Sequence, residues 1–313
     1  MIRSSHVAKW RNPTGSAGLA KRTGSPQATI DNDDIASEIM VPNILPDWAR
    51  VALTAVTVVS YLPQYHRILE QGDSEGLSLY YVLFNLISAT EQLTVGFFLN
   101  VNNTGSPRED VFVNNPATAG DWFNLAQLAI VWICSLVLLI LCFRYSATDG
   151  RRLTRDITSA TYIFVLSISL VPVVFDAANP DPRSEPRRWA QEIFLFAHYL
   201  FFLPLSSILI LAAVIPQIRM TRKRGSPGAL SLPGLAGQAV VFAILAISWM
   251  IRVKYPPYLP SWDEWYRLTG WPVVNNGFFA LGQLLLLWIA TRGYGGDADS
   301  IASAETQPLL SDG

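Results

Sequence analysis

The sequence has few charged residues and almost no cysteine. Only 15% of its 313 residues are Asp, Glu, Lys or Arg, and the formal net charge is -1 at pH 7. A chain without a basic excess lacks the electrostatic footprint of a nucleic-acid-binding protein. Its two cysteines, Cys134 and Cys142, lie in one apolar stretch, which excludes a disulfide framework and a cysteine-based metal site. We therefore expect neither a nucleic-acid partner nor a bound metal.

Enzyme motifs are also missing. The sequence contains no P-loop, no HExxH pair, no nucleophile elbow and no plausible catalytic triad. We accordingly expect that the protein is not an enzyme and needs no cofactor.

Hydrophobic residues make up half of the chain and are concentrated in seven long stretches. About 20 apolar residues in a helix cover a bilayer core of roughly 30 Å. Seven such stretches joined by short loops leave almost no polar face, so buried helices of a large soluble enzyme are the weaker interpretation. We predict an all-α membrane protein with seven transmembrane helices, at 47–68, 78–99, 121–143, 157–177, 193–219, 230–251 and 272–291.

The signals for orientation lie in the two tails and in the loops between the apolar stretches. Residues 1–46 have the polar, Gly/Ser-rich composition of a disordered tail. Asn102 begins an N-x-T acceptor, which is glycosylated only on the lumenal side. In the second tail, 293–313, an acidic residue and two leucines resemble a dileucine signal that sorting adaptors bind in the cytosol. Arginines and lysines after the third and fifth stretches favour the cytosol for those loops. These signals predict a lumenal N-terminus and a cytosolic C-terminus, and the sorting residues are Glu305, Leu309 and Leu310.

A segment of the chain is repeated. SYLPQYHR ends the first apolar stretch, and 153 residues later AVIPQIR ends the fifth. The same shift also superimposes the pairs Gln64/Gln217, Gly72/Gly225, Leu77/Leu230 and Ser78/Ser231. The seven helices then divide into a first triplet (47–143), a linker helix with its loops (144–190) and a second triplet (191–292). This 3+1+3 order, with two parallel repeats, is the arrangement of SWEET transporters, whose solute site lies between the repeats.

Each repeat places a proline inside an apolar stretch. Proline removes one backbone hydrogen bond and clashes with the carbonyl four residues earlier, which permits a bend. Such freed groups are tolerated in a membrane only beside a cavity or a partner. A single proline more often just ends a helix at the interface, but two in register favour a function. We predict that Pro63, Gln64, Pro216 and Gln217 form matched hinges of a gate.

The two segments LPQYHRILEQGDSEGLS and IPQIRMTRKRGSPGALS resemble the duplicated motif of the PQ-loop membrane family, which includes vacuolar and lysosomal amino-acid exporters such as cystinosin. The resemblance implies a seven-helix transporter that has its PQ ends toward the cytosol and moves solute out of an acidic organelle with protons. One feature departs from it. Exporters of cationic amino acids have an acid followed by asparagine in the second helix, whereas this chain reads ISATEQLTVG, with Glu91 about two residues late and Gln92 replacing the asparagine.

Polar residues within the spans are the candidates for a transport site. A charged side chain in a bilayer is costly and functional by default. Glu91, His198 and Asp176 fall in the predicted lumenal half, where they are suited to proton coupling. For His198 and Asp176, a charge that reaches the headgroups is an equally good interpretation. Among neutral polar residues, most of which pack helices together, the candidates for binding solute are Asn85, Gln127, Gln238 and Asn276.

Three functions remain open at this point. The first is a proton-coupled exporter of amino acids or similar small solutes at a vacuolar or lysosomal membrane. The second is a lipid-handling or scaffolding membrane protein that regulates trafficking, which the long polar N-terminal tail favours mildly. The third is a sugar uniporter, which needs no titratable residue, so Glu91 argues against it. Expected partners are the lipid bilayer, the solute, protons and a sorting adaptor, and the sequence gives no oligomeric state.

Overall fold

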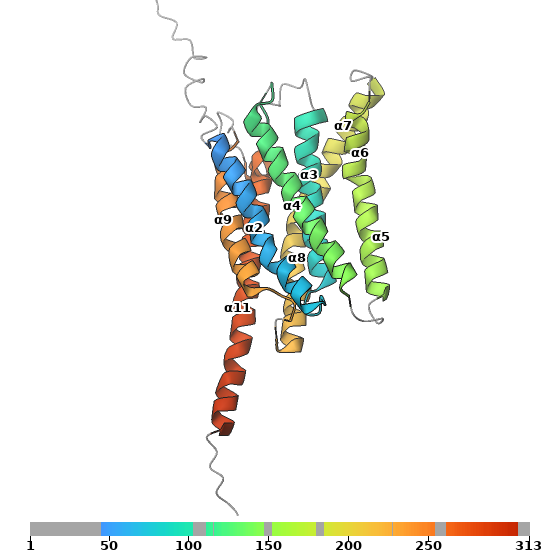
Figure 1. Cartoon of the computed structure of the whole chain (residues 1–313). Coiled ribbons are helices and arrows are strands. Elements are labelled where there is room, and N and C mark those ends of the chain that lie inside the picture. Colours follow the sequence, from blue (N-terminus) through green and yellow to red (C-terminus); the bar gives the residue numbers. More distant parts are fainter. Residues whose placement is uncertain are drawn as a thin grey trace, which may run out of the picture. The chain divides into compact units, whose positions relative to one another are not determined.

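The described part of the computed structural model is built from helices alone. It comprises residues 45–102, 111–114, 116–146, 152–179, 185–226, 228–253 and 261–305, and every regular element within these ranges is a helix (Figure 1). Of the predicted N-terminal tail, residues 1–44 lie outside the described residues, as do Leu309 and Leu310 of the sorting motif.

Each predicted span corresponds to one helix or to a short series of helices. In chain order these are α2 (Asp47–Gln71), α3 (Leu79–Phe97) with η1 (Phe98–Asn102), α4 (Ala119–Arg144), α5 (Arg152–Ile168) with α6 (Leu170–Ala177), α7 (Glu185–Ala197) with η3 (His198–Phe202) and α8 (Leu203–Arg224), α9 (Leu232–Met250), and α10 (Trp262–Trp265) with η4 (Tyr266–Gly270) and α11 (Trp271–Glu305). The last helix therefore continues past residue 292, where the second repeat was expected to end.

Six of the seven predicted spans are confirmed as helices long and apolar enough to cross a membrane. They are Leu79–Asn102, Ala119–Arg144, Arg152–Ala177, Glu185–Arg224, Leu232–Met250 and Trp262–Arg292. Helix α2 is not among them, although it has 25 residues. The reason lies in its two ends, because Asp47 and Arg50 begin the helix and His66, Arg67 and Glu70 follow its proline.

Prolines explain where three of the helical series change. A proline cannot donate to the carbonyl four residues earlier. Helix α5 ends at Ile168, four residues before Pro172, and the π-helical segments η3 and η4 lie directly before helices that carry Pro204 and Pro272 in their first turn. By contrast, α2 and α8 remain α-helical through Pro63 and Pro216.

The helix contacts follow the same pattern twice. Helix α4 packs against both α2 and α3, and α11 packs likewise against both α8 and α9. Two further pairs, α2 with α9 and α3 with α8, join these sets, while α5 and α6 pack against α3. Consecutive spans run in opposite directions (Figure 1). As a result, α2 and α8 end, and α3 and α9 begin, at one end of the bundle, which we call the PQ end.

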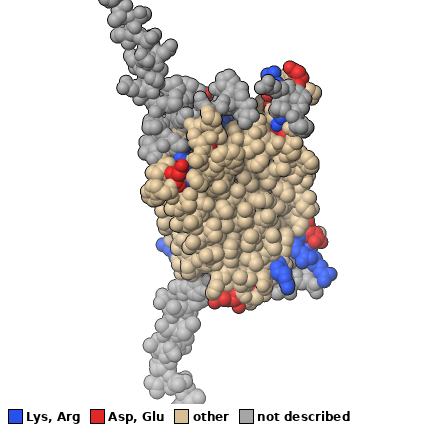
Figure 2. All heavy atoms as spheres, turned by 45° about the horizontal axis from the view of Figure 1, so that its top comes forward, with Lys and Arg blue, Asp and Glu red and all other residues tan. Residues whose placement is uncertain are grey.

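Charged side chains are confined to the margins of the face seen in Figure 2. Lys, Arg, Asp and Glu gather toward its two ends, and the broad band between them is almost entirely uncharged. Many large apolar side chains on this molecule are exposed, such as Phe164, Phe175 and Ile208. An uncharged band of apolar side chains is what a lipid environment requires.

Candidate functional site

The glutamines of the two PQ motifs bind the opposite repeat segment. Nε2 of Gln64 donates to the carbonyl of Ala229 at 2.7 Å, and its Oε1 accepts from the backbone N–H of Ser231 at 2.9 Å. Gln217 does the same in the other direction, donating to the carbonyl of Gly76 at 2.7 Å and accepting from the N–H of Ser78 at 2.9 Å.

These four hydrogen bonds form what we call the glutamine clamp. The 153-residue shift that relates Gln64 to Gln217 also relates Gly76 to Ala229 and Ser78 to Ser231, so the two halves of the clamp are equivalent. Both glutamine side chains are buried, and both ends of each amide are satisfied by backbone groups. The clamp fastens the end of α2 to the start of α9, and the end of α8 to the start of α3.

Glycines shape the turns that the clamp holds. Gly72 and Gly225 follow the last residues of α2 and α8 with φ of 64° and 66°, in the left-handed region where a glycine costs least. These positions are again 153 residues apart. The matching backbone is the reason why each turn brings the next helix start to the opposite glutamine.

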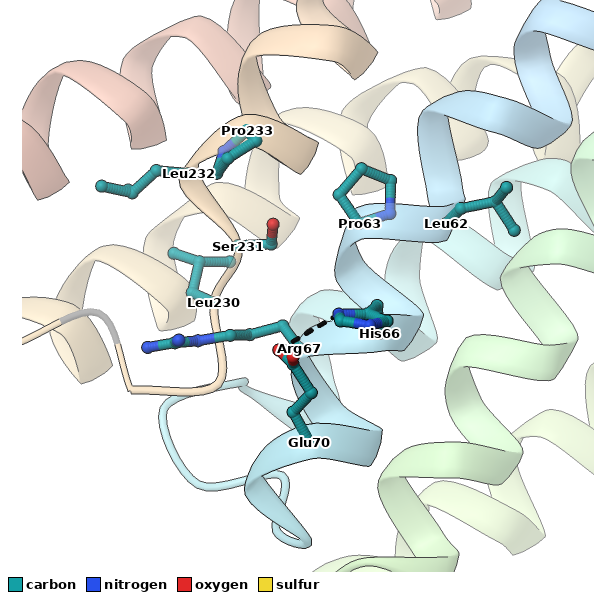
Figure 3. Close-up of a pocket in the computed structure, with 9 residues that line it drawn as sticks. All are labelled: Leu62, Pro63, His66, Arg67, Glu70, Leu230, Ser231, Leu232 and Pro233. Atoms are coloured by element: carbon teal, nitrogen blue, oxygen red, sulfur yellow. Dashed lines mark ion pairs between the residues drawn. The ribbon is translucent and has the colours of Figure 1, made fainter.

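An open cavity adjoins the clamp at the PQ end. It has a volume of about 580 Å³ and lies between one face of α2 and the segment that leads into α9. Figure 3 shows Pro63 and His66 on one side of this cavity and Ser231 and Pro233 on the other. Nδ1 of His66 lies 3.1 Å from a carboxylate oxygen of Glu70 at its margin.

Deeper in the bundle, three small cavities adjoin one another. Their volumes are about 10, 20 and 20 Å³, each near the minimum that holds one water molecule. The middle cavity shares Asn85 and Ser135 with one neighbour and Gln92 and Asn276 with the other. The helices therefore close around a row of small cavities, lined by apolar side chains and a few polar ones, that are too small for an organic solute.

All four residues predicted to bind solute line these cavities. Asn85 and Gln238 line the cavity nearer the clamp, Asn276 lines two of the three, and Gln127 lines the one with Trp249. They come from α3, α9, α11 and α4. The structure thus brings together side chains from both predicted triplets, and their role in binding stays a prediction.

The residues predicted for proton coupling lie in two other places. Nδ1 of His198 lies 2.7 Å from Oε1 of Glu91, and both side chains are almost fully buried. The His198 ring stacks on Phe194 with centroids 3.9 Å apart. Neither residue lines the three cavities, because Glu91 is on the face of α3 that meets η3, next to the cavity-lining Gln92.

Asp176 belongs to a separate cluster at the end of α6. Its carboxylate accepts from Nε of Arg187 at 2.7 Å, from Gln191 at 2.7 Å and from Nδ2 of Asn102 at 2.6 Å. Asn102 is the residue predicted to carry a glycan, and the same nitrogen also donates to the carbonyl of Val173. Glycosylation of Asn102 therefore stays a prediction, on a side chain that is buried in the structure.

Sequence reasoning missed two buried arginines at the end of the bundle opposite the PQ end. Arg50 is fully buried, and Arg252 is 2% exposed. Arg252 follows an apolar stretch, so in the sequence it resembles an ordinary loop charge. The sequence holds one sign of this burial. The third apolar stretch contains two polar residues, Asn124 and Gln127, that are able to accept hydrogen bonds from Arg252.

A family comparison agrees with this geometry. Residues 50–103 match the family model described as PQ loop repeat. The chain carries a PQ-loop repeat. The match covers α3, the turn before it and α2 from Arg50 onward, including Pro63 and Gln64, so the predicted resemblance to this family is confirmed on the first of the two segments. No curated protein and no solved structure matches the chain. Six apolar helices and the PQ-loop match together make the chain a multi-pass membrane protein.

Proposed function

We propose that the chain is a proton-coupled transporter that exports amino acids or similar small solutes from an acidic organelle to the cytosol by alternating access. The observation that carries this proposal is the glutamine clamp at one end of a row of cavities whose lining includes polar side chains. A transporter needs a central site that one gate at a time shields from water. The clamp provides a gate at the PQ end, and the cavities provide the site in a closed state.

The proposal includes two parallel three-helix repeats joined by the linker helix α5–α6. Support comes from the repeated helix contacts, in which α2, α3 and α4 correspond to α8, α9 and α11. Both α3 and α9 also begin directly after the serine that the clamp binds. Alternating access then consists of a movement of one triplet against the other around the cavities.

The stabilisation expected from the four hydrogen bonds of the clamp is suited to a gate that opens and closes. A buried hydrogen bond stabilises a protein by about 0.5–1.5 kcal/mol net, so four of them contribute roughly 2–6 kcal/mol to the closed PQ end. Conformations that interconvert in function differ by only a few kcal/mol. The clamp is therefore strong enough to hold the gate closed and weak enough to be released by solute binding or protonation. Pro63 and Pro216 lie one residue before the glutamines, where the helix backbone is most easily bent.

The Glu91–His198 pair is the proposed proton site. A carboxylate and an imidazole 2.7 Å apart in a buried place can gain or lose one proton, and that event changes the charge at the α3/η3 contact. Ser88, one turn from Glu91, donates to the carbonyl of Ser206 at 2.7 Å and so joins α3 to α8, the helix that follows η3. Since Ser88 also lines the central cavity, a change at Glu91 reaches the solute site through one helical turn.

The direction of transport follows from the proposed orientation, with the PQ end in the cytosol and the N-terminus in the lumen. The dileucine motif, Glu305 with Leu309 and Leu310, and its adaptor supply the vacuolar or lysosomal location. We expect Leu309→Ala with Leu310→Ala to move the protein to the cell surface or to other endomembranes.

Flux assays with the reconstituted full chain test this function. We expect uptake of at least one amino acid or sugar-sized solute to rise with an imposed proton gradient. The same vesicles with a fluorescent phospholipid test the lipid-handling alternative. Lipid scrambling without solute flux would favour the lipid-handling function over the transporter. Solute flux that does not depend on pH would contradict proton coupling.

A further inference from the structure

Two positive charges are buried side by side at the end of the bundle opposite the PQ end. Nη1 of Arg50 donates to Oδ1 of Asn124 at 2.6 Å and to the carbonyl of Gly120 at 2.9 Å. Nη1 of Arg252 donates to Oε1 of Gln127 at 2.9 Å and to the same Oδ1 of Asn124 at 3.3 Å. The two guanidinium groups thus share one amide oxygen.

The two arginines differ in what balances their charge. Arg50 has Asp47 within 3.6 Å. Within the described residues, the hydrogen bonds of Arg252 go only to the neutral acceptors Asn124 and Gln127, and its guanidinium lies over the ring of Trp249, 4.9 Å from the centroid. Burial, with the like charge of Arg50 as a smaller cause, lowers the pKa of Arg252 to about 9. A buried charge is stable only when it is paired and hydrogen bonded, so Arg252 has an unmet requirement for an anion.

The unsatisfied groups around Arg252 are all donors. Within the described residues, Nε and Nη2 of Arg252, Nδ2 of Asn124 and Nε1 of Trp271 are buried without a hydrogen-bond partner. Nε and Nη2 form one edge of the guanidinium, and this edge binds a carboxylate through two parallel hydrogen bonds. Trp271 contacts Trp249, the ring on which Arg252 lies. A set of donors around a cation fits an anion and excludes a metal ion.

This cluster is continuous with the central cavities. Gln127, which accepts from Arg252, lines one cavity together with Trp249. Through its Nε2, Gln127 also donates to Oγ1 of Thr57 at 3.1 Å. An anion bound at the free edge of Arg252 therefore lies beside the proposed solute path. A lipid phosphate fits less well, because both arginine side chains are enclosed by protein.

We propose that Arg252, supported by Arg50 and Asn124, is a binding site for the carboxylate of a small organic solute. The site rests on the proposed transport function, since it names the chemical class of the solute that the path accepts. Gly120 leaves room for the Arg50 guanidinium, because a Cβ at this position would lie 3.1 Å from Cζ of Arg50. The carboxylate would supply the acceptors that Arg252 lacks, and it would neutralise one of two adjacent buried charges.

Binding of matched carboxylates and amides to the full chain tests the site. The purified protein in phosphatidylcholine nanodiscs is titrated with alanine and alaninamide, lactate and lactamide, succinate and succinamide, and inorganic phosphate. We expect at least one carboxylate to bind and to raise the unfolding temperature, while its amide does neither. Arg252→Gln should weaken that binding by about 10- to 100-fold, the loss expected for two charge-assisted hydrogen bonds.

Two further variants keep the comparison decisive. Arg252→Lys keeps the charge and loses the two-nitrogen edge, so it should bind more weakly than wild type even if Arg252→Gln does not reach the membrane. Arg188→Gln removes an exposed arginine and should change nothing. The site is refuted if no carboxylate binds, if binding is equal in wild type and the Arg252 variants, or if phosphate binds through Arg252 more tightly than every carboxylate.

The same reagents separate this site from the transport function. A carboxylate that binds through Arg252 but does not cross vesicle membranes would overturn the transporter and leave the site standing. Solute flux that is unchanged by Arg252→Gln would support the transport function and contradict the carboxylate site.

Discussion

The two ends of the bundle differ in symmetry. At the PQ end, every atom pair of the clamp has a counterpart 153 residues away. At the opposite end, the same shift places Leu203 opposite Arg50 and Leu99 opposite Arg252. Glu91 likewise corresponds to Ile244. A gate between two similar halves works best when both halves contribute equally, whereas an asymmetric solute and its proton need different groups on each side. The correspondence over 153 residues is thus kept at the clamp and lost at Arg50, Arg252 and Glu91.

The largest expected effect comes from removing both prolines. Pro63→Leu with Pro216→Leu adds a backbone hydrogen bond to α2 and to α8 and stiffens both at the clamp. We expect the double variant to reach the membrane and to lose at least about 90% of its flux, while binding from one side persists. Of the single variants, Pro216→Leu should be the more damaging, because α8 also carries Pro204 and follows His198. Flux at the wild-type rate in the double variant would rule out hinges at these prolines.

The next effect concerns the clamp itself. Gln64→Leu and Gln217→Leu each remove two hydrogen bonds and leave two backbone groups unpaired, at a cost of about 1–3 kcal/mol to the closed state. This shifts the closed-to-open ratio of the PQ end by roughly 5- to 150-fold in either variant. Accessibility of cysteines introduced at the cavity, measured with a membrane-impermeant thiol reagent, reports the shift. Lys223→Ala, at an exposed residue of the same end, is the control. Unequal shifts would show that the two halves of the clamp are not equivalent.

A smaller and different effect is expected at the charged pair. Glu91→Gln keeps the shape and the contact with His198 but removes one proton site. We expect transport to lose its dependence on the proton gradient while exchange of solute across the membrane continues. Counterflow at two pH values measures both properties together. A variant whose flux still follows the gradient would move the proton site away from Glu91.

The smallest effect on transport is expected in the C-terminal tail. Leu309→Ala with Leu310→Ala changes the location of the protein and leaves flux in reconstituted vesicles unchanged, because the motif lies outside the helical bundle's repeats. Microscopy of the tagged variant against an organelle marker measures the first part. Unchanged location would identify the motif as a chance match.

Much of this fold follows from the sequence because the bilayer permits few solutions. A run of apolar residues in a membrane must satisfy its own backbone, so its length predicts a helix. Six spans follow in this way. Helix α2 is less apolar than the others because polar and charged residues lie at both of its ends. The prediction of a duplicated motif required nothing more than the spacing between Pro63 and Pro216. The π-helical segments before Pro204 and Pro272 were not predicted, because several backbone adjustments relieve a proline equally well.

The candidate sites follow from the sequence less completely. Polarity within a span predicted Asn85, Gln127, Gln238 and Asn276, which do line the cavities. The partners of Gln64 and Gln217 were beyond reach, because they are backbone groups more than 130 residues away, and composition carries no information about them. The burial of Arg252 was not predicted, for a related reason. A charge at the end of a span looks the same in the sequence whether it faces headgroups or the protein interior.

Distance measurements across the PQ end test the central account most directly. Spin labels at Glu70 and Lys223, both exposed at the ends of α2 and α8, are placed in a protein whose Cys134 and Cys142 are replaced by alanine. We predict two distance populations by double electron–electron resonance. Gln64→Leu and Gln217→Leu should enlarge the longer population, each to a similar extent, and a transported solute should change the balance in the wild type. A single distance, unchanged by solute and by both glutamine variants, would contradict the account of the clamp as a gate.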